Sequence, residues 1–97
     1  MDADRIHEIV GHVVADLHDQ LPIVSHEVAG QQISLVISGR GPLTLNMHPD
    51  TLERLVDDSG TLSGDYFAAR PKLIELLKQA IESEVEEVTI EDSDLWP

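Results

Sequence analysis

Residues 31–47, QQISLVISGRGPLTLNM, decide the fold of this chain because they read as two strands joined by a tight turn. Apolar and mostly polar side chains alternate along both halves, and successive side chains of a strand point to opposite faces of a sheet. Each strand therefore has an apolar face that needs cover and a more polar face that can meet water. The turn is the Gly-Arg-Gly-Pro segment at 39–42. The apolar face consists of Ile33, Leu35, Ile37, Leu43, Leu45 and Met47.

Amphipathic helices before and after this hairpin can cover its apolar face. Residues 4–18 carry apolar side chains at steps of three and four, which is one stripe of a helix. Residues 48–56 begin with His-Pro-Asp, which suits a helix start because proline loses no hydrogen bond there. Residues 61–69 read as a connector. Arg70-Pro71 then opens a third predicted helix, which runs to Ile81 with a broad apolar face.

Two shorter segments complete the predicted architecture. Residues 23–28 form a weakly patterned strand before the hairpin, and residues 88–90 alternate in the way that is typical of a short edge strand. The sequence thus predicts an α+β fold: an N-terminal helix, a three-stranded antiparallel meander, two C-terminal helices and a short terminal strand. We expect residues 1–91 to form a single α+β domain, followed by an acidic C-terminal tail at 92–97.

Charge is the strongest feature of the composition. Nineteen acidic residues face six Lys and Arg, which gives a formal net charge of -13. Such a field repels nucleic acid and anionic membranes and favours cationic partners. A surface selected for solubility, or a salt-rich host, would produce the same composition, so the charge alone does not separate these explanations from a docking role.

Composition also limits the chemistry and the compartment. The chain has no cysteine, which excludes disulfides, thiolate metal sites and a cysteine nucleophile. No apolar run reaches the roughly 20 residues that span a bilayer. The N-terminus is charged and mixed in sign, unlike a signal peptide. The expected compartment is therefore the cytoplasm.

Several segments follow one another in an order that is typical of a known family. They are Gly30, ISLVISGRG at 33–41, LTLNM at 43–47, HPDTL at 48–52, and the helix that runs to Ile81. This order resembles the YbaB/EbfC family of small nucleoid-associated proteins. Members of that family are dimers and many bind DNA. The resemblance implies an α+β homodimer and, as an alternative function, DNA binding, which we assign to no residue.

No motif for catalysis, nucleotide binding or zinc binding is present in the chain. GxSxG, P-loop, GxGxxG and HExxH patterns are all missing. The five histidines are not spaced as a helical metal pair, although His26 and His48 could approach each other on the polar face of the sheet, near Glu27 and Asp50. We therefore predict no cofactor and no catalytic or metal-binding residue. A small metal-dependent enzyme is the least favoured alternative.

Two places in the chain suit contact with a partner. Arg40, flanked by Gly39 and Gly41 at the hairpin tip, is either an exposed turn residue or a contact for a phosphate or carboxylate. The Leu-Trp pair at 95–96 follows an acidic run and either docks into a partner or folds back over the sheet edge. We predict a non-catalytic, homodimeric acidic binding or regulatory protein that engages a protein partner with a basic surface. The candidate partner-binding residues are Arg40, Asp92, Asp94, Leu95 and Trp96.

Overall fold

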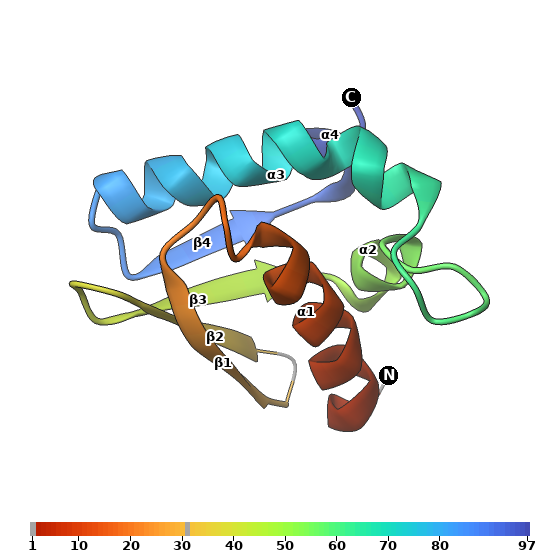
Figure 1. The fold of residues 1–97 in the computed structure, drawn as a ribbon, viewed down its shortest axis with the longest axis horizontal. Coiled ribbons are helices and arrows are strands. Elements are labelled where there is room, and N and C mark those ends of the chain that lie inside the picture. The colour runs from red at the N-terminus through yellow and green to blue at the C-terminus, as the bar shows by residue number, and fades with distance from the viewer. Residues whose placement is uncertain (1, 31) are drawn as a thin grey trace.

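The computed structural model describes residues 2–30 and 32–97. Met1 and Gln31, the first residue of the predicted hairpin stretch, lie outside the described residues. The elements form one four-stranded sheet, in the order β1-β2-β3-β4, together with helices (Figure 1). In chain order they are α1 (Ala3–Leu17), β1 (Ile23–Ala29), β2 (Gln32–Ile37), β3 (Pro42–Met47), α2 (Pro49–Arg54), α3 (Gly64–Glu82), β4 (Glu87–Ile90) and α4 (Asp92–Leu95).

The sheet is mixed rather than purely antiparallel. Strands β1, β2 and β3 pair antiparallel, as the predicted meander requires. The predicted terminal strand is also present, but β4 lies parallel to β3, with Thr44 opposite Glu87 and Met47 opposite Ile90. Parallel neighbours need a long crossover, usually helical, and here α2 and α3 supply it. The prediction of a three-stranded antiparallel sheet is therefore corrected to four strands of mixed direction.

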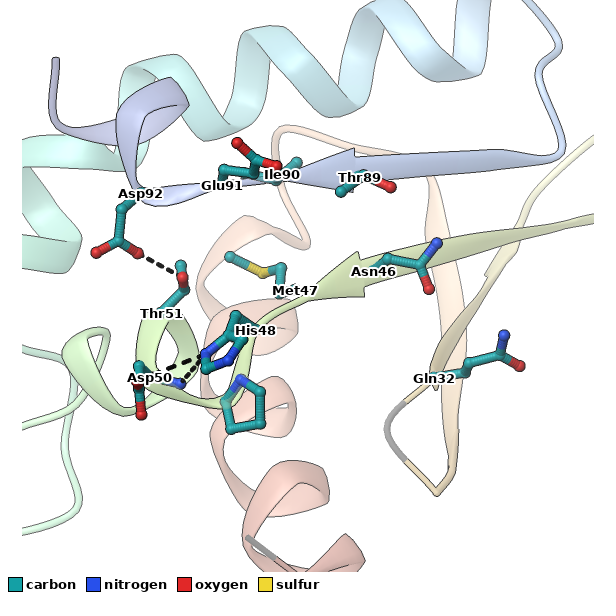
Figure 2. Close-up of a pocket in the computed structure, with 11 residues that line it drawn as sticks. Gln32, Asn46, Met47, His48, Asp50, Thr51, Thr89, Ile90, Glu91 and Asp92 are labelled. Carbon is teal, nitrogen blue, oxygen red and sulfur yellow. Dashed lines mark hydrogen bonds and ion pairs between the residues drawn. The ribbon is translucent and has the colours of Figure 1, made fainter.

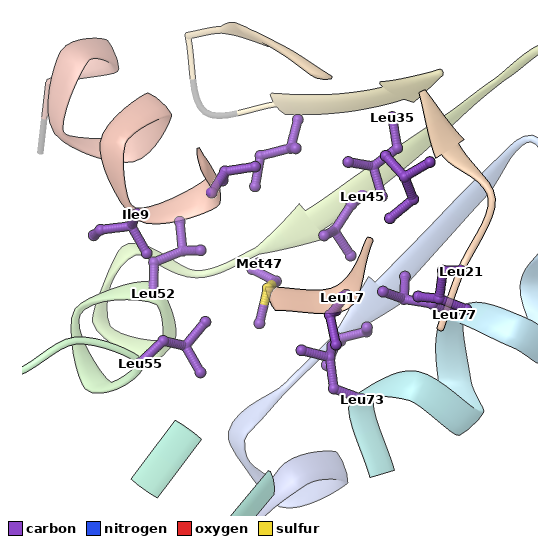
Figure 3. Close-up of a cluster of buried hydrophobic side chains, with 14 of the residues drawn as sticks. Ile9, Leu17, Leu21, Leu35, Leu45, Met47, Leu52, Leu55, Leu73 and Leu77 are labelled. Atoms are coloured by element: carbon purple, nitrogen blue, oxygen red, sulfur yellow. The ribbon is translucent and has the colours of Figure 1, made fainter. Parts of the chain in front are cut away.

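The alternation predicted for the central hairpin is confirmed by its burial. All six residues of the predicted apolar face are buried, whereas the intervening residues of β2 and β3 are at least partly exposed. Figure 3 shows Leu35, Leu45 and Met47 of the sheet meeting Leu17 of α1 and Leu73 and Leu77 of α3. Full burial of such a side chain contributes about 1.5–3 kcal/mol. One face of the sheet thus forms the core with α1, α2 and α3.

Helix α3 begins earlier than the sequence pattern predicts. Residues 64–69, predicted as part of a connector, are its first turns, and Pro71 lies inside the helix instead of opening it. The Ser63 hydroxyl caps the helix by accepting a hydrogen bond from the Tyr66 backbone N–H at 3.1 Å. Tyr66 and Ala69 are both fully buried. Their burial and this cap outweigh the backbone donor that Pro71 removes.

Within residues 2–30 and 32–97, no helix combines the length and the apolar character needed to cross a bilayer.

A polar network joins α1 to α3 at the edge of the core. The Tyr66 hydroxyl donates to the Asp16 carboxylate, and Arg70 Nε donates to the same oxygen, Oδ2, at 2.7 Å. The hydrogen bond from Tyr66, followed by those from Arg70, lowers the pKa of Asp16. Burial and the Asp16 carboxylate raise the pKa of Tyr66. The network therefore holds Asp16 ionised and Tyr66 neutral at the junction of the two helices.

Replacing Asp16 by Asn tests this junction. Asp16→Asn should lower the free energy of unfolding by about 1–2 kcal/mol at pH 7, because hydrogen bonds to a charged acceptor are lost from a partly buried site. The folded-state pKa of Asp16 is lower than its unfolded value, so the contribution is complete above pH ~4 and disappears as the pH falls further. Urea denaturation across this range measures both effects.

Asp19→Asn is the matched control for that variant, because it removes the same charge from an exposed position close by in the sequence. It should leave the free energy of unfolding nearly unchanged. Equal losses in the two variants would contradict the role of the junction.

Candidate functional site

The second face of the sheet is open and polar. Its side chains are exposed or half-exposed along all four strands. The strands contain no lysine or arginine. Register places a glutamate at each end of one row across the sheet. Two rows of this open sheet face are Glu27, Ser34, Thr44 and Glu87, and then Ala29, Gln32, Asn46 and Thr89, and Val36 of β2 lies on the same face.

A hollow of about 660 Å³ lies at one end of the open sheet face (Figure 2). Three residues of the second row also line this hollow, so the two features are continuous. The rest of its wall comes from the ends of β3 and β4 and from the first turns of α2 and α4. We call it the strand-end hollow. Its polar lining is Gln32, Asn46, His48, Asp50, Thr51, Thr89, Glu91 and Asp92.

Parallel pairing explains why the hollow forms here. The carboxyl ends of β3 and β4 meet at the same edge of the sheet, and a helix begins directly after each strand. His48 caps α2, because its Nδ1 accepts a hydrogen bond from the Asp50 backbone N–H at 3.1 Å. Glu91 caps α4, and its own backbone N–H donates to Asp94 Oδ2 at 2.8 Å. Crevices outside the carboxyl ends of parallel strands are common ligand sites in α/β sheets.

The charge of the hollow is negative and only partly compensated. Asp92 accepts a hydrogen bond from the Thr51 hydroxyl and lies 3.6 Å from Arg54 Nη1. The Asp50 side chain is 92% exposed, with His48 Nδ1 at 3.6 Å from its carboxylate. Among the described residues, the lining contains these two aspartates and Glu91 but no lysine or arginine. The arrangement suits an amine or guanidinium group that would donate hydrogen bonds to these carboxylates.

Arg40, a candidate partner-binding residue, binds the end of α3. Its guanidinium donates to the carbonyl oxygens of Ala80 and Ile81, both at 3.3 Å, and to that of Val85 at 2.6 Å. A cation at a helix C-terminus satisfies free carbonyls and complements the helix dipole. Arg40 precedes β3, whereas the strand-end hollow follows it. The structure therefore does not bring Arg40 together with the other candidates.

The C-terminal candidates lie together, folded back onto the domain. Leu95 is 4% exposed, and the Trp96 indole N–H donates to the Asp65 carbonyl oxygen at 2.9 Å. The Arg54 guanidinium carbon lies 4.0 Å from the centre of a Trp96 ring, and Arg54 also pairs with Asp65 at 3.0 Å. We call Arg54, Asp65, Asp92 and Trp96 the Arg54 clasp. Asp92 belongs both to the Arg54 clasp and to the lining of the strand-end hollow, so the two features are adjacent. Asp94 caps the short helix α4, of which Asp92 is the first residue.

The histidines are arranged differently from the expectation. His26 lies on the covered face of the sheet, beside His7 of α1 with ring centroids 4.8 Å apart. It therefore does not share the polar face with His48, because the irregular pairing between Ile23 and Ser25 changes the register of β1. No group of three or more His, Asp or Glu within the described ranges is placed to hold a metal ion.

Sequence reasoning missed Asp50 and Glu91 as parts of one site. They lie far apart in the chain and meet only because β3 and β4 are parallel. One signal was available: an alternating strand runs directly into a polar helix start at 47–50 and again at 90–92, with a long helix between them. A helical connection between two strands favours parallel pairing, which would place both helix starts at one edge.

Comparison with known proteins found no match among family models, curated proteins or solved structures.

The Arg54 clasp can be tested with the fluorescence of Trp96, the only tryptophan of the chain. Arg54→Ala should weaken the packing of the C-terminal residues by about 1 kcal/mol, because a cation–π contact and two ion pairs are lost. Emission should shift to longer wavelength, and acrylamide should quench it more strongly.

Lys78→Ala removes the same charge from an exposed position on α3 and serves as the control. Its Trp96 emission should equal that of the unmodified protein. Identical spectra for all three proteins would show that the clasp does not hold Trp96 in solution.

Proposed function

We propose that this chain is a non-catalytic, homodimeric binding protein that engages a basic segment of a protein partner. The binding surface is the strand-end hollow together with the adjoining open sheet face. The observation that carries the proposal is the lining of the hollow, which presents Asp50, Glu91 and Asp92 without a lysine or arginine among the described residues. A basic side chain entering the hollow meets carboxylates, and hydroxyl and amide groups on the sheet face can bind its backbone.

The distribution of cations supports a basic partner. Arg5 pairs with Glu53 at 3.2 Å, Arg70 with Asp16 at 2.7 Å, and Lys72 lies 3.9 Å from Glu75. Arg40 and Arg54 are occupied at the end of α3 and in the Arg54 clasp. Little positive charge is left to face outward in a chain of net charge -13. Long-range attraction therefore favours cationic surfaces and should weaken as salt screens it.

A lysine-rich peptide tests the proposed surface directly. The double variant Asp50→Asn with Glu91→Gln should weaken its binding by about 0.5–2 kcal/mol, since each exposed charge pair contributes a fraction of a kcal/mol to about 1 kcal/mol. Titration calorimetry at moderate salt gives the affinity. A glutamine-substituted peptide of the same length should not bind.

The control double variant is Glu82→Gln with Glu84→Gln, which changes the net charge equally. Both residues lie where α3 ends, near the start of β4, away from the strand-end hollow. The control should bind the peptide as the unmodified chain does. Equal losses in the two double variants would mean that only the overall field attracts the peptide and would refute a site at the hollow.

The homodimer is proposed because a chain of 97 residues forms a small core and leaves surface that a second copy could cover. Strands β1 and β4 are the edges of the sheet, and Val24 on β1 is 66% exposed. Light scattering at micromolar protein concentration should give twice the monomer mass in both low and high salt. A monomer mass under both conditions would refute this part of the proposal.

DNA binding of the YbaB/EbfC kind is the weaker alternative. Neutralising several phosphates requires exposed cations, and most of the six here are engaged within the molecule. The alternative predicts binding to a DNA duplex at 150 mM salt that is lost on Lys72→Glu with Lys78→Glu, two exposed positions whose change leaves the Arg70–Asp16 pair intact. The main proposal predicts no duplex binding by the unmodified chain.

A further inference from the structure

A histidine without a hydrogen-bond partner lies beneath helix α1. His26, on β1, faces the core side of the sheet opposite Leu35 of β2. Its Nε2 is shielded from solvent and has no hydrogen-bond partner among the described residues. Buried polar atoms are almost always paired, because an unpaired one loses its hydrogen bonds to water without compensation. An uncharged imidazole can leave one nitrogen without a proton, whereas a protonated ring would bury an N–H donor and a positive charge.

The surroundings of His26 offer its charged form no counter-ion. From α1, the His7 ring lies against it with centroids 4.8 Å apart. Gly11 of the same helix comes close as well, since a Cβ on it would lie 3.8 Å from Nε2. From β2 the facing residue is Leu35, which is buried and apolar. Burial lowers the pKa of His26 most, and the positive charge of His7 lowers it further. A hydrogen bond with the His7 backbone raises this pKa by a smaller amount.

We propose that His26 is a pH sensor that holds α1 on the sheet only while its ring is uncharged. When α1 is docked, Nε2 of the half-buried His26 ring is shielded from water, and no carboxylate among the described residues pairs with the ring. When α1 moves away, the ring becomes hydrated and binds a proton normally. Acid therefore favours the undocked form, in which the apolar side of α1 and the covered face of the sheet are exposed. Glu8 of α1 does not pair with His26 in the described structure, because its carboxylate lies 3.9 Å from Arg5 Nη1 and close to Gly60.

The sign and the size of the effect follow from proton linkage. The pKa of His26 is lower in the docked form than the ordinary value of ~6.5, so docking is unaffected above that pH and weakens as the pH falls below it. At pH 5.5, protonation of the undocked ring favours undocking by at most about tenfold, the limit that is reached when the docked ring takes up no proton.

Hydrogen exchange on the full chain tests the proposal. Protection of α1 amides such as Ile9 and Val10, corrected for the intrinsic effect of pH, should fall between pH 7.5 and 5.5 by up to about tenfold. Protection of α3 amides such as Leu73 should change much less. In His26→Gln and His26→Leu, the α1 protection should be the same at both pH values. In His7→Gln, which keeps His26, the loss at pH 5.5 should persist.

Titration of His26 in the unmodified protein, followed by NMR of the ring protons, provides a readout that needs no variant. A folded-state pKa below 6.5 supports the proposal, and one at or above 6.5 overturns it. Unchanged α1 protection in the unmodified chain at pH 5.5 also overturns it. A loss that persists in both His26 variants overturns it as well, because His26 would then not be the sensor.

Discussion

The structure depends on strand β3 being paired on both sides. A tight turn joins β3 to its antiparallel partner β2, but its parallel partner β4 can be reached only after the chain has crossed back along the sheet. That crossing places α3 over the apolar face, where Leu73 and Leu77 close the core. It also brings the ends of β3 and β4 to one edge, each continuing into a short helix. The core and the strand-end hollow thus arise from the same pairing, one on the face of the sheet and one at its edge.

Two arginines secure this crossover at its two ends. Arg40, before β3, binds the last carbonyls of α3, and Arg54, after β3, holds Asp65 at the start of α3 and Trp96 beyond β4. Each therefore uses its planar guanidinium to connect segments that are distant in the chain. Charges used in this way are not available to an external anion. Because these arginines are engaged within the molecule, its exterior is left acidic. Both features favour a basic partner over a nucleic acid.

The hairpin and α1 could be predicted because their periodicity is local. The six apolar residues of the hairpin alternate without interruption, and each is buried. The start of α3 could not be predicted, because Pro71 is a helix-start signal while the decisive burial of Tyr66 depends on Asp16, which lies on another element. In the sequence, Arg40 between two glycines resembles a solvated turn residue. Only the fold shows that α3 ends beside it. The residues of the strand-end hollow form no recognisable motif within their own segments, and they come together only because β4 runs parallel to β3.

The covered and open faces of the sheet are connected because they share one backbone. In β2, Leu35 lies opposite His26 of β1 on the covered face, while its neighbours Ser34 and Val36 belong to the open face. The proposed pH sensor and the proposed binding surface therefore lie on opposite faces of the same sheet, and the shared backbone of the paired strands is the connection between them.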